Sequence, residues 1–292
     1  MFVIKAIFNA INSCIKYINT YFKTFVLLFI FVFFVLLANF ASSDTSFANL
    51  QRIYINGAIL DSTQLVDEIY AARDNELIKG VLLDINSPGG AAAASMEIAL
   101  AIDDLSKKKP VVAYARDYMT SGSYLAASSS SYIIANPIST IGSIGVLVSS
   151  ADISKALEKL GIKASNLSAG KYKQISNISK PLSKDEQAYI QAHIDKVYMI
   201  FADFVAKQRS LDMKDMSAWA DARIFVSKEA LEVGLIDEVA NIKRAEEKLK
   251  ELSKVDEAVF KEENSYNQSF IKTLSSDVSK ALSEILMQTI LH

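Results

Sequence analysis

Apolar and polar positions divide the chain into one long apolar run and a region of alternating short patterns. The run, residues 25–41, carries no charge, and the uncharged window extends from Thr24 through Ser43. About 20 residues would span roughly 30 Å as a helix, which is the thickness of a bilayer core. The pattern therefore predicts one N-terminal transmembrane helix over residues 25–41.

The charges around this run predict its orientation. Three lysines and no acidic residue precede it: Lys5, Lys16 and Lys23. The positive-inside rule then keeps residues 1–24 in the cytoplasm and places the rest of the chain on the outer side of the inner (plasma) membrane. A cleaved signal peptide is the alternative, because Ala41–Ser43 offers small residues for cleavage. The length of the apolar run favours an uncleaved anchor.

After a polar linker over residues 42–49, strand and helix patterns alternate through a globular domain at 50–240. Strands are predicted at 52–60, 79–87, 110–116 and 131–137, and helices at 62–75, at 91–108 and around Leu125. Strands that are apolar throughout and separated by helices indicate a mostly parallel α/β sheet with flanking helices. The C-terminal extension, 241–292, is predicted to be helical, with a charged helix at 243–263 and an amphipathic one at 276–292.

Composition excludes several classes of protein. The chain has 51% hydrophobic residues and 22% charged residues, as a folded protein does. Its 31 basic and 33 acidic residues include no basic block, so nucleic acid is not an expected partner. The single cysteine, Cys14, and the two histidines, His193 and His292, predict no disulfide framework, no metal site and no cofactor.

Two turns carry the candidate chemistry. "INSPGG" (Ile85–Gly90) ends a strand and begins a helix, and "MTSGSYLAAS" (Met119–Ser128) repeats the arrangement after the next strand. Both should lie at the carboxyl edge of the sheet, where α/β proteins bind their ligands. Ser121, at the start of the second helix, is either a nucleophile or an ordinary N-cap.

These segments, together with "TIGSIGVL" (140–147), "AGKYKQIS" (169–176) and 220–239, resemble the signal peptide peptidase A (protease IV) family. The resemblance implies a Clp-protease/crotonase-like fold and a serine peptidase. Position by position it implies that Ser121 is the nucleophile and Lys173 the general base. The family's usual "SGGYY" reads "SGSYL" here, so Ser123 and Leu125 depart from it.

The candidates for a catalytic base can also be compared from the residues alone, without the resemblance. A serine needs a base, yet His292 ends the chain and His193 lies in a long amphipathic helix that starts with a capping box at Ser183 and Glu186. That position is typical of a surface or packing histidine. A lysine can act as the base where its surroundings lower the pKa from about 10.4 toward roughly 7–8.

The remaining site residues are backbone donors and pocket residues. The N–H of Gly89 or Gly90 and that of Gly122 are candidates for an oxyanion hole. Residues Thr140, Gly142 and Ser143 are predicted to border the substrate, although an ordinary strand turn explains them equally well.

The resemblance implies a membrane-anchored endopeptidase with a Ser-Lys dyad that degrades cleaved signal peptides and other flexible peptides. In the short, single-copy form it implies a ring-shaped homo-oligomer, an octamer, in which neighbouring subunits supply the serine and the lysine. Three alternatives stay open: a general quality-control peptidase of the envelope, a crotonase-like acyl-CoA enzyme, and a non-catalytic membrane scaffold.

Overall fold

The structure is a computed structural model of the 292-residue chain, and it describes residues 12–13, 15–17, 20–24, 26–27, 29–30, 33 and 48–261. Most of the predicted anchor at 25–41, most of the linker at 42–49 and the predicted helix at 276–292 lie outside the described residues. No helix within the described part is long and apolar enough to cross a membrane. The chain divides into two compact units, 1–47 and 48–292, and the second contains the sheet.

The sheet has eight strands and is almost entirely parallel, as the sequence predicts. The path β6-β5-β3-β2-β1-β8 forms its body, β4 pairs with β3 and β7, and β5 with β6 is the antiparallel pair. The strands are β1 (Leu50–Asn56), β2 (Gly80–Ser87), β3 (Val111–Thr120), β4 (Tyr132–Ala135), β5 (Thr140–Gly142), β6 (Ile224–Val226), β7 (Glu238–Val239) and β8 (Phe260–Lys261).

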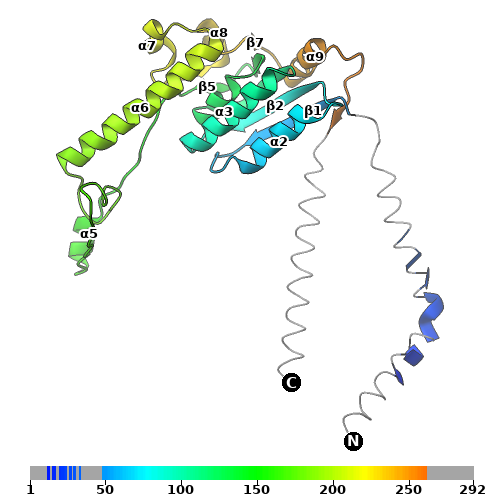
Figure 1. The fold of residues 1–292 in the computed structure, drawn as a ribbon, viewed down its shortest axis with the longest axis horizontal. Coiled ribbons are helices and arrows are strands. Elements are labelled where there is room, and N and C mark those ends of the chain that lie inside the picture. The colour runs from blue at the N-terminus through cyan, green and yellow to red at the C-terminus, as the bar shows by residue number, and fades with distance from the viewer. Residues whose placement is uncertain are drawn as a thin grey trace, which may run out of the picture. The chain divides into compact units, whose positions relative to one another are not determined.

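Helices cover both faces of this sheet, which explains why its strands are apolar throughout. Alternate residues of a strand point to opposite faces, so Val81 and Leu83 join the larger core while Leu82 joins the smaller one. The larger core includes side chains of α2 (Thr63–Asp74), α3 (Ala92–Ser106), α4 (Gly122–Ala127), α6 (Lys184–Arg209) and α8 (Ser227–Glu232). Helix α9 (Ile242–Ser253) covers the other face, and Figure 1 shows α2 and α3 alongside β1 and β2.

Two predicted elements are corrected by the structure. Strand β3 does not end at Arg116, because it pairs first with β4 and then, through Tyr118–Thr120, with β5. The predicted helix at 243–263 ends at Ser253, because Lys254 adopts a left-handed conformation and the chain returns as β8 beside β1.

One segment of the second unit contributes nothing to either core. Residues 146–182, called the arm below, contain the short helix α5 (Ser154–Lys159) and no buried residue. The arm is attached to the beginning of α6, where the ring of Tyr172 stacks on that of Tyr189 with 4.3 Å between centroids. Figure 1 shows α5 beyond the end of α6 that lies farther from the sheet. Helix α6 begins with the capping box of Ser183 and Glu186, as predicted.

Candidate active site

Ser121 occupies a strained turn between a strand and a helix. It follows the last residue of β3, precedes the first residue of α4, and has φ 53° and ψ −123°. A positive φ costs a residue with a Cβ about 1–3 kcal/mol, so the surrounding structure must enforce it. Its amide donates to the Gly142 carbonyl at 2.7 Å, but its hydroxyl makes no capping hydrogen bond. Ser121 is therefore not acting as a helix cap.

The turn at Gly89 and Gly90 packs directly against the turn at Ser121. Gly89 has φ +90°, and a Cβ placed there would lie 2.5 Å from the nitrogen of Gly122 and 2.9 Å from the Cβ of Ser121. Only glycine allows the two turns to approach this closely. The contact brings the backbone of one turn next to the candidate nucleophile on the other.

Backbone amides at this contact are not equally available. The Gly89 amide donates to the hydroxyl of Ser87 at 3.1 Å. The Gly90 amide has no hydrogen-bond acceptor among the described residues. Gly122 is the first residue of α4, so its amide has no acceptor within the helix. Of the three glycines predicted for an oxyanion hole, Gly90 and Gly122 therefore retain amides that a ligand could use.

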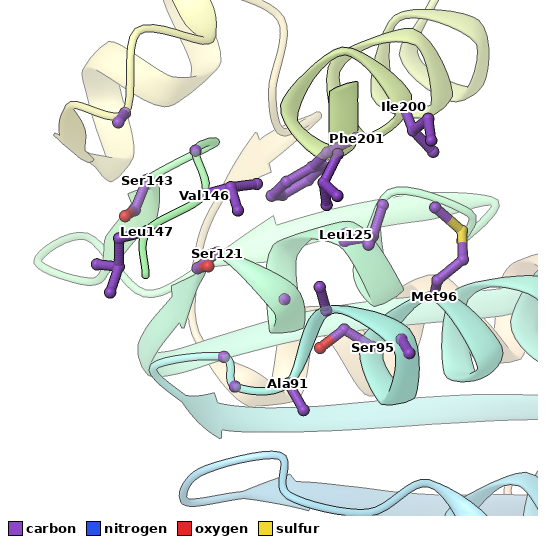
Figure 2. Close-up of a pocket in the computed structure, with 18 of the residues that line it drawn as sticks. Ala91, Ser95, Met96, Ser121, Leu125, Ser143, Val146, Leu147, Ile200 and Phe201 are labelled. Carbon is purple, nitrogen blue, oxygen red and sulfur yellow. The ribbon is translucent and has the colours of Figure 1, made fainter. Parts of the chain in front are cut away.

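A cleft of about 820 Å³ opens beside Ser121. Its walls come from α3, α4, α6 and the segment after β5, and they are mostly apolar. Figure 2 shows Leu125 and Met96 on one side of the cleft and Ile200 and Phe201 of α6 on the other. His193 is the ionisable side chain among the described residues that line it. The cleft therefore suits an apolar ligand that reaches the Ser121 hydroxyl.

Of the three residues predicted to border a substrate, one lines the cleft and two do not. Ser143, with φ 52°, lines the cleft, whereas Thr140 and Gly142 do not. Gly142 instead has φ +94° and lies against Phe225, and its carbonyl accepts the hydrogen bond from the Ser121 amide. Gly142 thus stabilises the turn of Ser121 through this backbone hydrogen bond.

Lys173 does not join Ser121 in one chain. It is exposed on the arm and does not line the cleft. Its neighbour Tyr172 packs on Tyr189 of α6, which is about 18 Å along the helix from Phe201 at 1.5 Å per residue. The arm therefore holds Lys173 near the far end of the helix that covers the cleft.

Tyr124 anchors the short helix that follows Ser121. Its ring is fully buried, and its hydroxyl donates to the Leu235 carbonyl at 2.7 Å. Burial raises the pKa of Tyr124 far above its ordinary value, so the hydroxyl stays protonated as a donor. Nearby, Arg209 of α6 forms a two-pronged ion pair with Asp237. The segment that precedes β7 is thus connected to α4 through Tyr124 and to α6 through Arg209.

A family model described as peptidase family S49 matches residues 103–256, which is more than half of the chain. The chain belongs to peptidase family S49. The resemblance to the signal peptide peptidase A (protease IV) family is thus confirmed.

Three proteins of similar sequence have been given names. A provisionally named protease of Methanocaldococcus jannaschii is 38% identical over 204 residues, which cover 70% of this chain and 62% of that protein. The chloroplastic serine protease SPPA of Arabidopsis thaliana is 32% identical, with 65% of this chain and 28% of that protein covered. Protease 4 of Haemophilus influenzae is 33% identical, with 74% and 36% covered. The chain matches less than two thirds of the length of each.

The S49 match contains Ser121, Lys173 and the cleft-lining part of α6, whereas the turn at Gly89 and Gly90 precedes it. That turn is attached to the site by its packing against Gly122.

His193 is a surface histidine of α6, as predicted, but its place at the cleft was not predicted. It is exposed on α6 and lines both the Ser121 cleft and a neighbouring cleft of about 420 Å³ beneath the arm. Its spacing to Val197, Ile200 and Phe201, which line the same cleft, is that of one helix face. That spacing was the signal in the sequence for its place at the cleft.

Proposed function

We propose that this chain is a serine endopeptidase in which Ser121 attacks a peptide carbonyl and Lys173 of a neighbouring copy accepts the Ser121 proton. The observation that carries the proposal is the free hydroxyl of Ser121, held at a positive φ beside two available amides. A strained turn that presents a serine at the end of a strand is a recurrent way to expose a nucleophile.

The amides of Gly122 and Gly90 are the proposed oxyanion hole. Attack on the carbonyl carbon moves charge onto the carbonyl oxygen, and preorganised N–H donors stabilise that charge. Loss of one such donor costs roughly 3–4 kcal/mol of transition-state stabilisation in comparable sites. The engagement of the Gly89 amide with Ser87 favours Gly90 over Gly89 for this role.

A neighbouring copy is the proposed source of the base. Within one chain Lys173 lies outside the cleft, on an arm that has no buried residue. A second copy packed against the cleft could bring its own arm to Ser121 while burying apolar side chains such as Leu147 and Leu167. We therefore propose a ring-shaped homo-oligomer of eight copies.

The proposed substrates are flexible apolar peptides, including cleaved signal peptides. An apolar cleft without a charged lysine, arginine or carboxylate among its described lining residues suits apolar side chains. The predicted anchor over residues 25–41 would hold the enzyme at the inner membrane with its peptidase domain on the outer side. Substrates remaining in that membrane would then be close to the cleft.

A fluorophosphonate probe tests the nucleophile directly. We expect the full-length protein to be phosphonylated at Ser121, as identified by mass spectrometry, and the Ser121→Ala variant to remain unlabelled and inactive. Digestion of synthetic signal peptides and of an unfolded protein then compares the two substrate classes. Two results would remove Ser121 from the mechanism: attachment of the probe to another residue while Ser121 stays unmodified, or hydrolysis by Ser121→Ala at the wild-type rate.

A further inference from the structure

Ser123 links the two turns of the candidate site through a single hydroxyl. This residue is fully buried in the first turn of α4, at the position where the family's usual "SGGYY" has glycine. Its Oγ accepts a hydrogen bond from the Thr120 amide at 2.9 Å and donates to the Ser87 carbonyl at 2.7 Å. A hydroxyl has one proton, so the Thr120 carbonyl at 2.9 Å is the weaker alternative acceptor.

The two partners of Ser123 stand directly before the two turns. Thr120 is the last residue of β3 and precedes Ser121, and Ser87 is the last residue of β2 and precedes the Pro88–Gly90 turn. The regular pairing of these strands breaks down at this point, since Ile85 pairs with Ala115 but Ser87 pairs with Met119. The Ser123 hydroxyl therefore connects β2 and β3 at the point where the backbone pairing between these strands is irregular.

Ser87 extends the connection to the amides. Its own hydroxyl donates to the Gly57 carbonyl at 2.6 Å and accepts from the Gly89 amide at 3.1 Å. This second bond orients the Pro88–Gly89 peptide. The following peptide, Gly89–Gly90, is held by the Ile59 amide, which donates to the Gly89 carbonyl at 2.8 Å, and the Gly90 amide is left unpaired among the described residues. The chain of contacts runs from the nucleophile turn through Ser123 and Ser87 to Gly89, the residue that precedes the proposed oxyanion amide.

We infer that Ser123 is a positioning residue that sets the distance between the Ser121 hydroxyl and the amide of Gly90. The inference rests on the proposed function. Rates of nucleophilic attack depend steeply on such distances, and a displacement of about 1 Å can reduce them by about 100-fold. The Ser123 hydroxyl thus links the two turns through hydrogen bonds that a glycine at this position could not form.

The experiment compares Ser123→Ala with the control Ser128→Ala in the full-length protein. Ser128 is equally buried at the end of the same helix, but its hydroxyl donates only to the Leu125 carbonyl, at 2.7 Å, within that helix. The readouts are the rate constant for phosphonylation of Ser121 and the kcat and KM for a peptide, measured well below the Tm of each protein. We expect Ser123→Ala to lower both rates about tenfold with KM unchanged, and Ser128→Ala to leave both rates unchanged.

Equal rates in the two variants would overturn the inference, as would a change in KM with kcat and the phosphonylation rate unaltered. A Ser123→Cys variant, whose thiol is slightly larger than the hydroxyl and forms much weaker hydrogen bonds, replaces Ser123→Ala if that protein does not fold. Wild-type rates in this variant would also overturn the inference. Failure of the proposed function has a different signature, because wild-type protein would then not be labelled at Ser121.

Discussion

The two halves of the proposed site are built in opposite ways. Ser121 lies between β3 and α4, where Met119, Gly122 and Tyr124 are fully or almost fully buried and the backbone is fixed on several sides. Lys173 lies on the arm, where no residue is buried between Gly145 and Asp185. The core can therefore hold the nucleophile in a strained conformation, whereas the arm is held only by contacts such as that of Tyr172 with Tyr189 and has no buried residue to position a base.

The nucleophile and the base must therefore be positioned by different means. A strained residue persists only when the structure around it over-determines it, and the core does this for Ser121 within one chain. A segment with few buried contacts opens at low free energy and gains order by binding something. We propose that the arm gains that order from a second copy of the chain.

The largest expected effect is at Ser121 itself. Both Ser121→Ala and Ser121→Gly should lose hydrolysis by about 10⁴-fold or more. Glycine tolerates the positive φ and alanine does not, so Ser121→Gly should have the higher free energy of unfolding, by about 1 kcal/mol. Urea unfolding of the two variants measures this difference, and an equally stable alanine variant would show that the turn is not strained.

On the arm, two neighbouring lysines should differ strongly. Lys173→Ala should lower kcat by about 10²–10⁴-fold, because a general base contributes that much. Lys171→Ala is the matched control: its exposed ammonium pairs with Asp185 at 2.9 Å, and exposed pairs contribute little to stability. Steady-state kinetics of both variants provide the measurement, and equal losses would remove Lys173 as the specific base.

The smallest expected effect concerns the attachment of the arm to α6. Hydrogen bonds from Lys180, and then from the Ser183 amide, lower the pKa of Glu186 from 4.5 to about 2. Because the folded pKa is the lower one, this contribution to stability is present above about pH 4.5 and is lost as the pH falls toward 2.

Glu186→Gln should therefore flatten the pH dependence of stability between pH 4.5 and 2 while leaving the rest of the curve unchanged. Thermal unfolding across this range, with Asp185→Asn as the neighbouring control, measures the effect. The same slope in wild type and Glu186→Gln would show that Glu186 does not anchor the arm.

The sequence predicted the sheet well because its strands are buried on both faces and separated by helices. It predicted the continuation of β3 poorly, since the exposed residues Arg116 and Asp117 interrupt the apolar pattern while the strand changes partner. The positive φ of Ser121 and the pairing of the Gly89 amide with Ser87 left no trace in the pattern, because both depend on contacts between distant segments.

Mixing two inactive variants tests whether Ser121 and Lys173 of different subunits form one site. Ser121→Ala and Lys173→Ala are dissociated and reassembled together, and phosphonylation is measured on the Lys173→Ala subunit, which keeps Ser121 and is distinguished by mass. The account predicts that this subunit regains part of the wild-type labelling rate, and that reassembly with the double variant Ser121→Ala/Lys173→Ala gives none. Verified mixed oligomers without any recovered labelling would contradict it, because each Ser121 would then depend on Lys173 of its own chain.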